Sequence, residues 1–201
     1  MTIEFHFDFG SPNAYLSHRL IPGIEQRTGA SLVYVPVLLG GVFKLTGNQS
    51  PMMQFKDVKN KLEYQNLEMR RFISKHQLTE FRMNPHFPVN TVQIMRGAVV
   101  AEMDGVLKQY VDAVFHHMWE AGNKMDDPDV IRSALGESGI DGERILERIG
   151  QQEIKDRLLR NTEASVARGT FGSPTFFVGR EMFFGKDRLG DVEAEIASGR
   201  R

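Results

Sequence analysis

The chain of 201 residues contains no cysteine. This absence excludes disulfides, dithiol redox cycling, a protein thiolate nucleophile and every cysteine-based metal site. The chain also lacks the G-x-G-x-x-G and G-x-x-x-x-G-K-[ST] loops that hold phosphate groups, and its six histidines show no H-E-x-x-H or H-x-x-x-H spacing. We therefore expect no metal site, and any sulfur chemistry has to use a sulfur atom that a ligand brings.

The sequence also has no large net charge of either sign and no long apolar run. The formal net charge is −1, which gives no reason to expect nucleic acid or an anionic membrane as a partner. No apolar run approaches the roughly 20 residues that a membrane-spanning helix needs. The first nine residues, MTIEFHFDF, alternate instead of carrying the basic and apolar blocks of a signal peptide, so we expect a cytoplasmic protein.

Both ends of the chain carry patterns that are typical of strands. Residues 3–9 alternate apolar and polar side chains, which predicts a strand, and Ser11 with Pro12 predicts a helix directly after it. Pro22 should kink or stop that helix. A second strand is predicted over residues 32–41, closed by a glycine pair.

The middle of the chain is rich in helix formers at helical spacing, and strands return near its end. Three kinds of element are therefore expected after residue 50: helices, a hairpin turning at Gly179-Arg180, and a last helix from about Asp187. The helical segments are 55–71, 91–121, one that opens at 126–135 with Asp127 as its cap, and one or two within 142–169. This order favours an α/β protein in which a helical insertion separates two halves of a small mixed sheet.

Two short motifs could carry chemistry, and each also has a purely structural interpretation. In GSPN (10–13), Ser11 either caps a helix or stands at a helix start whose free N–H groups stabilise an anion such as a thiolate. In FGSPTFFV (171–178), Gly172 and Pro174 either form a turn into a strand or provide a cis-proline edge to which a peptide-like ligand pairs. Neither motif decides between its two interpretations alone.

Taken in order, these features resemble the thioredoxin-like proteins with a DsbA-type insertion, with Ser11-Pro12-Asn13-Ala14 at the place of Cys-x-x-Cys. Within that group the chain resembles the 2-hydroxychromene-2-carboxylate isomerases and kappa-class glutathione transferases, from about residue 2 to 195, and NPHFPVNT favours the isomerases. The supporting stretches are FDFGSPNAYL (7–16), Gly47-Asn48 with Pro51, Lys61 with Tyr64, NPHFPVNT (84–91), FGSPTFFV (171–178) and FFGKDRL (183–189).

The resemblance implies a thioredoxin-like domain formed by residues 1–43 and 168–201, with residues 44–167 as an all-helical insertion. It also implies glutathione as cofactor and a homodimer. Ser11 would hydrogen-bond the glutathione thiolate, and the backbone of Ser173, before Pro174, would pair with the cysteinyl part. Lys186 and Asp187 match the place where the γ-glutamyl end is held, and a carboxylate suits the glutamyl ammonium.

Further residues are implied or suggested for the two ligands. Asn48 and Lys61 match positions that hold the glycyl end, although Lys61 could equally be a solvated helix lysine and Asp187 could cap the last helix. Asn13 is a candidate contact to an aromatic small-molecule substrate. Phe9 and Tyr15 either line the apolar side of that site or belong to the core.

The activity implied by the resemblance is a glutathione-dependent isomerisation of 2-hydroxychromene-2-carboxylate-type substrates to trans-o-hydroxybenzylidenepyruvate-type products, in the breakdown of naphthalene-like aromatics. Two alternatives stay open at this point. One is a kappa-like transferase or peroxidase, in which the sulfur stays on the product. The other is a module that binds glutathione without turnover.

Overall fold

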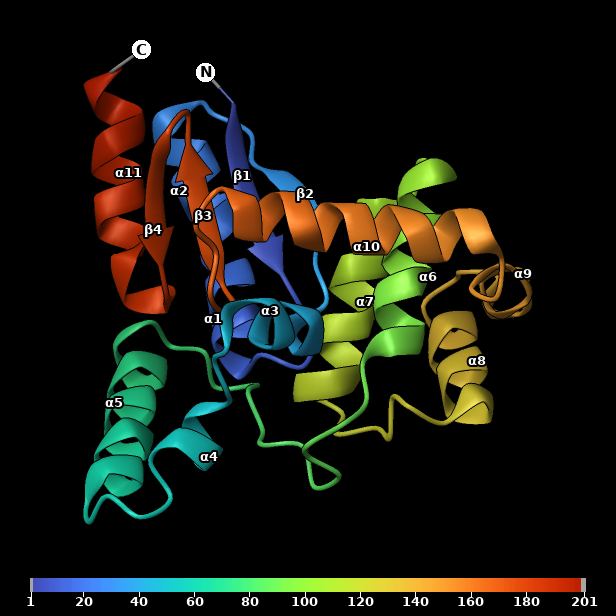
Figure 1. The fold of residues 1–201 in the computed structure, drawn as a ribbon, viewed down its shortest axis with the longest axis horizontal. Helices are drawn as coiled ribbons and strands as arrows, with labels where there is room; N and C mark the ends of the chain where they lie inside the picture. The colour runs from blue at the N-terminus through green and yellow to red at the C-terminus, as the bar shows by residue number, and fades with distance from the viewer. Residues whose placement is uncertain (1, 200–201) are drawn as a thin grey trace.

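The computed structural model describes residues 2–199, which form one mixed sheet surrounded by helices (Figure 1). The strand order is β2-β1-β3-β4. The strands are β1 (Ile3–Phe7), β2 (Val33–Pro36), β3 (Thr175–Val178) and β4 (Glu181–Phe184). β1 is parallel to β2 and antiparallel to β3, with His6 opposite Thr175, so both ends of the chain meet in one sheet. This is the α/β architecture that the order of periodicities predicts.

Helices account for most of the remaining chain. They are α1 (Pro12–His18), α2 (Ile21–Thr28), α3 (Leu39–Thr46), α4 (Pro51–Gln54), α5 (Lys61–Lys75), α6 (Val92–Met103), α7 (Leu107–Trp119), α8 (Pro128–Glu137), α9 (Gly142–Arg148), α10 (Gln152–Ala167) and α11 (Leu189–Ser198), with a 3-10 turn η1 (Lys186–Arg188) before the last. Figure 1 shows α6–α9 gathered to the right of the sheet and α10 reaching back across to it. Among the described residues, no helix has both the length and the apolar character that crossing a membrane requires.

The apolar side chains of β1, together with Phe9 shortly after it, form an aromatic core next to Ser11. Phe5, Phe7 and Phe9 are fully buried. The ring of Phe7 contacts those of Phe5 and Phe9, and the rings of Phe7 and Phe9 both contact that of Phe115. The indole N–H of Trp119 donates a hydrogen bond to the carbonyl of Phe9 at 2.8 Å. This bond anchors α7 to the segment between β1 and Ser11.

The predicted strands at 3–9 and 32–41 are both too long. β2 ends at Pro36, and the glycine pair does not close a strand but lies inside α3. A Cβ on Gly41 would lie 3.2 Å from Cγ2 of Thr162, so a glycine lets α3 pack closely against α10. The apolar run LVYVPVLLGG therefore contains a strand and a helix start, which its hydrophobicity alone did not distinguish.

Several predicted helix limits also need correction. The helix predicted at 55–71 runs over Lys61–Lys75, after the separate turn α4. The segment 91–121 is broken into α6 and α7 at Gly105, whose φ is +75°. Pro22 stands in the first turn of α2, so it marks the stop between α1 and α2. Segment 142–169 holds two helices, and the last α-helix begins at Leu189.

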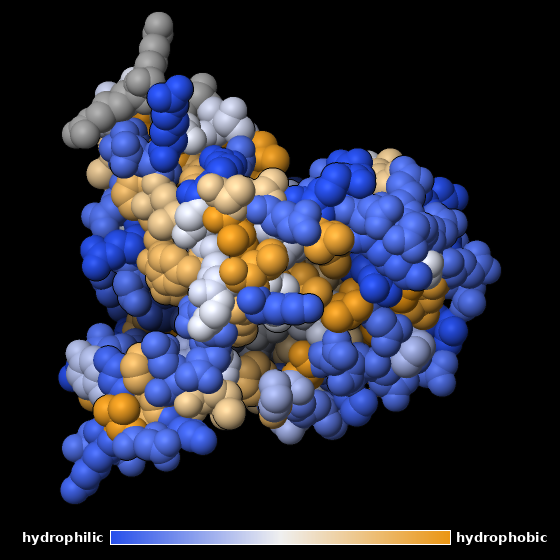
Figure 2. Space-filling model, in the orientation of Figure 1, coloured by the Kyte–Doolittle hydropathy of each residue, from blue (hydrophilic) through white to orange (hydrophobic). Residues whose placement is uncertain are grey.

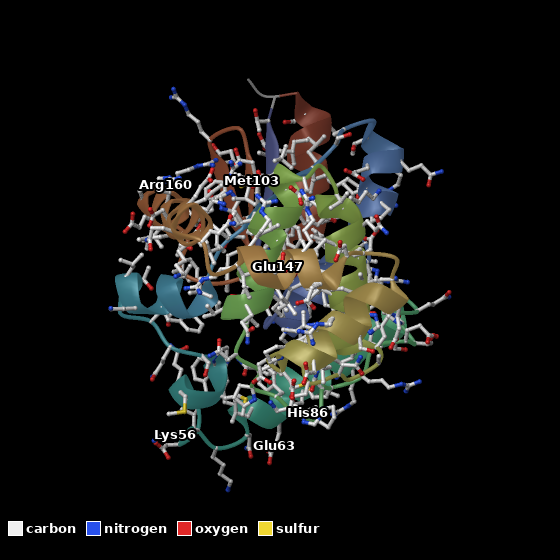
Figure 3. The ribbon with its side chains drawn as sticks, turned by 90° about the vertical axis from the view of Figure 1, so that its right-hand side faces the viewer. Lys56, Glu63, His86, Met103, Glu147 and Arg160 are labelled. Atoms are coloured by element: carbon white, nitrogen blue, oxygen red, sulfur yellow. The ribbon has the colours of Figure 1, made fainter. Side chains whose placement is uncertain are left out.

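Other predictions about elements are confirmed. Asp127 caps α8 through a hydrogen bond from the N–H of Asp129, and the hairpin turns at Gly179-Arg180. Helices α4 and α5 project from the sheet at the lower left of Figure 1, and no residue of α5 is fully buried. Figure 3 shows Lys56 and Glu63 pointing outward from this end of the molecule. The division into domains at residues 43 and 168 remains a prediction.

Candidate functional site

Ser11 lies where β1 gives way to α1, and its hydroxyl is engaged on both sides. Its Oγ accepts the N–H of Ala14 at 3.2 Å, so it caps α1 as the sequence predicts. The same hydroxyl donates to the backbone carbonyl of Ser173 at 2.9 Å. Ser11 is 4% exposed. One hydroxyl therefore joins the start of α1 to the loop before β3.

The Ser173–Pro174 peptide bond is cis, and it stands at the beginning of β3. If the ladder continued past His6–Thr175 in the same register, Asp8 would lie opposite Ser173, but the N–H of Asp8 donates to Oγ of Ser173 at 3.1 Å. The carbonyl of Ser173 consequently faces Ser11 instead of β1. Pro174 is buried, and its carbonyl accepts the N–H of Gly185 at 3.0 Å.

Asp8 supports this region and was not singled out from the sequence. Its carboxylate accepts the N–H of Gly10 at 2.8 Å and the N–H of Leu39 at 2.7 Å, and it also contacts the hydroxyl of Thr91. Burial raises the pKa of Asp8 above its usual value, although these donors oppose that effect. The only sequence signal was a charged residue at the end of the strand, immediately before the G-S-P turn.

Lys186 and Asp187 pair with each other. The ammonium of Lys186 lies 2.8 and 2.9 Å from the two carboxylate oxygens of Asp187 and 4.8 Å above the ring of Phe72 in α5. The Lys186 side chain is 7% exposed, whereas that of Asp187 is 70% exposed. This places a lysine, an accessible carboxylate and the projecting helix α5 together, and α1 packs against η1 beside them.

Asn48 and Lys61 lie on the segment that leads to α5. The side-chain amide of Asn48 donates to the carbonyl of Phe171 at 2.8 Å, so Asn48 is tied to the loop that contains Ser173. Lys61 is exposed at the start of α5, with its ammonium 5.2 Å above the ring of Phe55. Among the described residues, Asn48 is therefore connected to the Ser173 loop, whereas Lys61 is not.

The three candidate substrate residues differ. Phe9 and Tyr15 are buried, so the structure assigns both to the core, the alternative that the sequence left open. The Tyr15 hydroxyl donates to Glu120 at 2.8 Å and borders a groove of about 450 Å³ that Ser11 and Ser173 do not line. Asn13 follows Pro12 in α1, and its buried side-chain oxygen has no hydrogen-bond partner within the described residues.

Exposed aromatic side chains lie beside the Ser173 loop. The rings of Phe171 and Phe184 are 4.5 Å apart, and these residues are 39% and 42% exposed. A Cβ on Gly172 would lie 2.7 Å from the Phe184 ring, so glycine allows this close approach. Figure 2 shows apolar side chains gathered over β3 and β4 on this face. The region therefore combines polar groups with accessible apolar surface.

The geometry around Ser11 differs from that of a metal site and from that of an activated serine nucleophile. Within residues 2–199 no group of three or more His, Asp or Glu side chains is arranged to hold a metal ion. Neither the Ser11 nor the Ser173 hydroxyl contacts a histidine among the described residues. A serine that already donates to a carbonyl and lacks a base is suited to hydrogen bonding rather than attack.

The family model of the DsbA-like thioredoxin domain matches residues 2–197 of this chain. The chain belongs to the DsbA-like thioredoxin domain family. This confirms the predicted thioredoxin-like fold.

Similar proteins narrow the resemblance further. The chain is 28% identical to a 2-hydroxychromene-2-carboxylate isomerase of Pseudomonas putida, over 98% of this chain and 94% of that one. It is 24% identical to human glutathione S-transferase kappa 1, over 94% and 87% of the two chains. A solved 2-hydroxychromene-2-carboxylate isomerase superposes with a TM-score of 0.81 at 28% identity, over 98% and 95%. The predicted resemblance to these isomerases is confirmed for this DsbA-like chain.

Proposed function

We propose that this protein is a glutathione-dependent isomerase acting on 2-hydroxychromene-2-carboxylate-type substrates. The observation that carries the proposal is the Ser11 hydroxyl bonded to the carbonyl of Ser173 before a cis-proline, in a chain without cysteine. The relatives named as isomerases support the reaction, and the relative named as a glutathione transferase supports glutathione as the thiol.

The residues around Ser11 fit glutathione by the chemistry of their donors and acceptors. Glutathione carries a thiol, a peptide backbone and charged ends, and the site offers a hydroxyl, a backbone carbonyl, a carboxylate and a lysine. The orphaned side-chain oxygen of Asn13 provides one further buried acceptor for a bound molecule. No cysteine competes with the ligand for the role of thiol.

Each residue has a defined part in this proposal. Ser11 donates a hydrogen bond to the thiolate, and the backbone of Ser173 before Pro174 pairs with the cysteinyl part. Asp187, which is accessible, holds the γ-glutamyl ammonium of glutathione. Lys186 orients the Asp187 carboxylate and is proposed to pair also with the α-carboxylate at the same γ-glutamyl end.

Asn48 and Lys61 are proposed to hold the glycyl end, with the Lys61 ammonium attracting its carboxylate. Asn48 is the better supported of the two, because its hydrogen bond to the Phe171 carbonyl keeps it beside the Ser173 loop. For the aromatic substrate, the exposed rings of Phe171 and Phe184 offer apolar contact, and Asn13 offers an acceptor for a phenolic hydroxyl.

Glutathione, when bound, supplies a thiolate that can add to a conjugated C=C and leave again after rotation about that bond, so it is regenerated. The protein's task is to keep the thiol ionised. A free thiol has a pKa of about 8.5 and is mostly protonated at neutral pH. One hydrogen bond to a charged acceptor contributes roughly 1.5–3 kcal/mol, which lowers that pKa by about one to two units.

Two incubations distinguish the isomerase from its two alternatives. In the first, the protein is incubated with the chromene substrate and reduced glutathione, and both are followed by chromatography. Formation of the trans product without loss of glutathione supports the isomerase. In the second, a chlorinated aromatic replaces the chromene substrate, and a stoichiometric thioether supports a kappa-like transferase instead. Glutathione binding without either reaction leaves a binding module.

The proposal also covers the cellular location and the oligomeric state of the protein. A cytoplasmic location suits the activity, because the cytosol maintains reduced glutathione. A homodimer is proposed from the resemblance alone, and light scattering on the purified protein tests it.

A further inference from the structure

The hydrogen bond between Ser11 and Ser173 has a consequence for which thiols this site can activate. The hydroxyl of Ser11 has a single proton, and in this structure it is given to the carbonyl of Ser173 at 2.9 Å. To donate to a sulfur anion, Ser11 has to withdraw that proton from the carbonyl. The two hydrogen bonds are therefore mutually exclusive.

The carbonyl of Ser173 has no substitute donor. Within the described part of the chain, Ser11 is the only group that donates to it, and the nearest ladder N–H, that of Asp8, is bound to Oγ of Ser173. Ser173 is 9% exposed, and a thiol ligand seated against Ser11 covers that remaining surface, so water does not replace the missing donor once a ligand is bound. A buried acceptor without a donor is unfavourable by a factor of roughly 10 to 100 in the equilibrium.

A ligand can remove this penalty if it brings its own N–H. In an N-acylated cysteine the amide N–H is three bonds from the sulfur, so the two groups arrive together. We propose that thiol activation here is conditional on that N–H: it takes over the Ser173 carbonyl and thereby frees the Ser11 hydroxyl for the sulfur. This inference rests on the proposed function and defines its thiol as an N-acylcysteinyl thiol, with simple thiols excluded.

The test compares glutathione with its depsipeptide analogue, in which an ester oxygen replaces the cysteinyl N–H. The ultraviolet absorbance of the thiolate is titrated against pH at saturating concentrations of each ligand, which gives the pKa of the bound thiol without any turnover. With the wild-type protein, bound glutathione is expected to show a thiol pKa below about 8.5, whereas the bound ester analogue stays close to that value. The thiolate fraction at neutral pH should differ by roughly 10-fold or more.

Two variants make the comparison specific. In Ser11→Ala the two ligands should give the same thiol pKa, because no hydroxyl remains to be freed. Ser17→Ala is the matched control, because Ser17 is also a buried serine of α1 that donates to a backbone carbonyl, that of Asn13 at 2.9 Å. It should preserve the difference between the ligands.

The outcomes separate this inference from the proposed function. If the ester analogue is activated as strongly as glutathione, the inference is overturned while the isomerase proposal stands. If the analogue fails to bind even at roughly 1,000 times the glutathione Kd, the inference also fails, because one carbonyl hydrogen bond cannot account for so large a loss. If glutathione itself does not bind, both proposals fail.

Discussion

Two serines near β1 have opposite surroundings. Ser165 lies 2.8 Å from Nδ1 of His6, and Nε2 of His6 lies 2.8 Å from the carboxylate of Glu4, an arrangement that resembles a catalytic relay. Within residues 2–199, Ser11 has no such base, and its hydroxyl donates to the carbonyl of Ser173. By hydrogen bonding alone, Ser165 looks like the nucleophile and Ser11 does not.

Burial reverses that impression. Ser165 is completely buried, His6 is 3% exposed, and the Ser165 hydroxyl also contacts that of Thr170 at 2.7 Å, so this hydroxyl and imidazole are already partnered in the interior. Ser11 and Ser173 keep 4% and 9% exposure, and the exposed rings of Phe171 and Phe184 lie beside the loop that carries Ser173. The comparison teaches that a serine near a histidine can be purely structural, and that a serine without a base can still serve a ligand as donor.

The strongest test of this comparison is Ser11→Ala. Loss of one hydrogen bond to the thiolate is expected to lower turnover roughly 10- to 100-fold, measured as kcat/KM for the chromene substrate with glutathione. Stability should fall by about 2–4 kcal/mol, because the variant loses a helix cap and leaves the buried carbonyl of Ser173 without its donor. Unchanged turnover would remove Ser11 from the proposed mechanism.

Ser165→Ala should show the reverse pattern. The hydroxyl contacts of His6 and Thr170 are lost in a buried place, so the free energy of unfolding should fall by about 1–3 kcal/mol in urea titrations. Turnover of the folded fraction should match the wild type. A large loss of turnover at full folding would contradict the structural role of this cluster.

Asp8→Asn tests the support beneath Ser11. An amide offers one acceptor oxygen where the carboxylate accepts the N–H groups of Gly10 and Leu39, so the free energy of unfolding should fall by about 1–3 kcal/mol. The exposed Asp191→Asn is the control, with a change within about 0.5 kcal/mol.

The pH dependence of Asp8→Asn provides a second readout. Burial raises the pKa of Asp8, so the folded wild type keeps its proton to a higher pH than the unfolded chain does. Wild-type stability should therefore decline as the pH rises from about 4 to the raised pKa. The variant should lack that decline, and identical pH profiles would contradict the direction of the shift.

The smallest expected effect concerns His6. Burial holds the pKa of His6 below its usual value, although Glu4 opposes that effect. The unfolded chain therefore binds a proton at higher pH, and the stability present above about pH 6.5 is lost as the pH falls towards the folded pKa. His6→Gln should flatten this acid-side decline in urea titrations. A profile that parallels the wild type would contradict it.

Local patterns in the sequence were sufficient for much of the fold and for the position of the site. Composition alone shows that the chain has no cysteine. Neighbouring residues determine the alternation in β1, the Ser11 cap and the hairpin at Gly179-Arg180. Such features persist because backbone sterics, side-chain periodicity and capping act over a few residues. The resemblance across the two ends then indicated which segments meet.

Only the tertiary structure decided which secondary structure the apolar run at 32–41 adopts, which aromatic side chains are buried, and which group the Ser11 hydroxyl contacts. It ended β2 at Pro36 and made Leu39–Thr46 a helix, because the Leu39 N–H meets Asp8 and Gly41 packs against Thr162. It buried Phe9 and Tyr15 in the core. It also brought the Ser11 hydroxyl to the carbonyl of Ser173, 162 residues away, a contact that no local pattern contains because it depends on how the sheet closes.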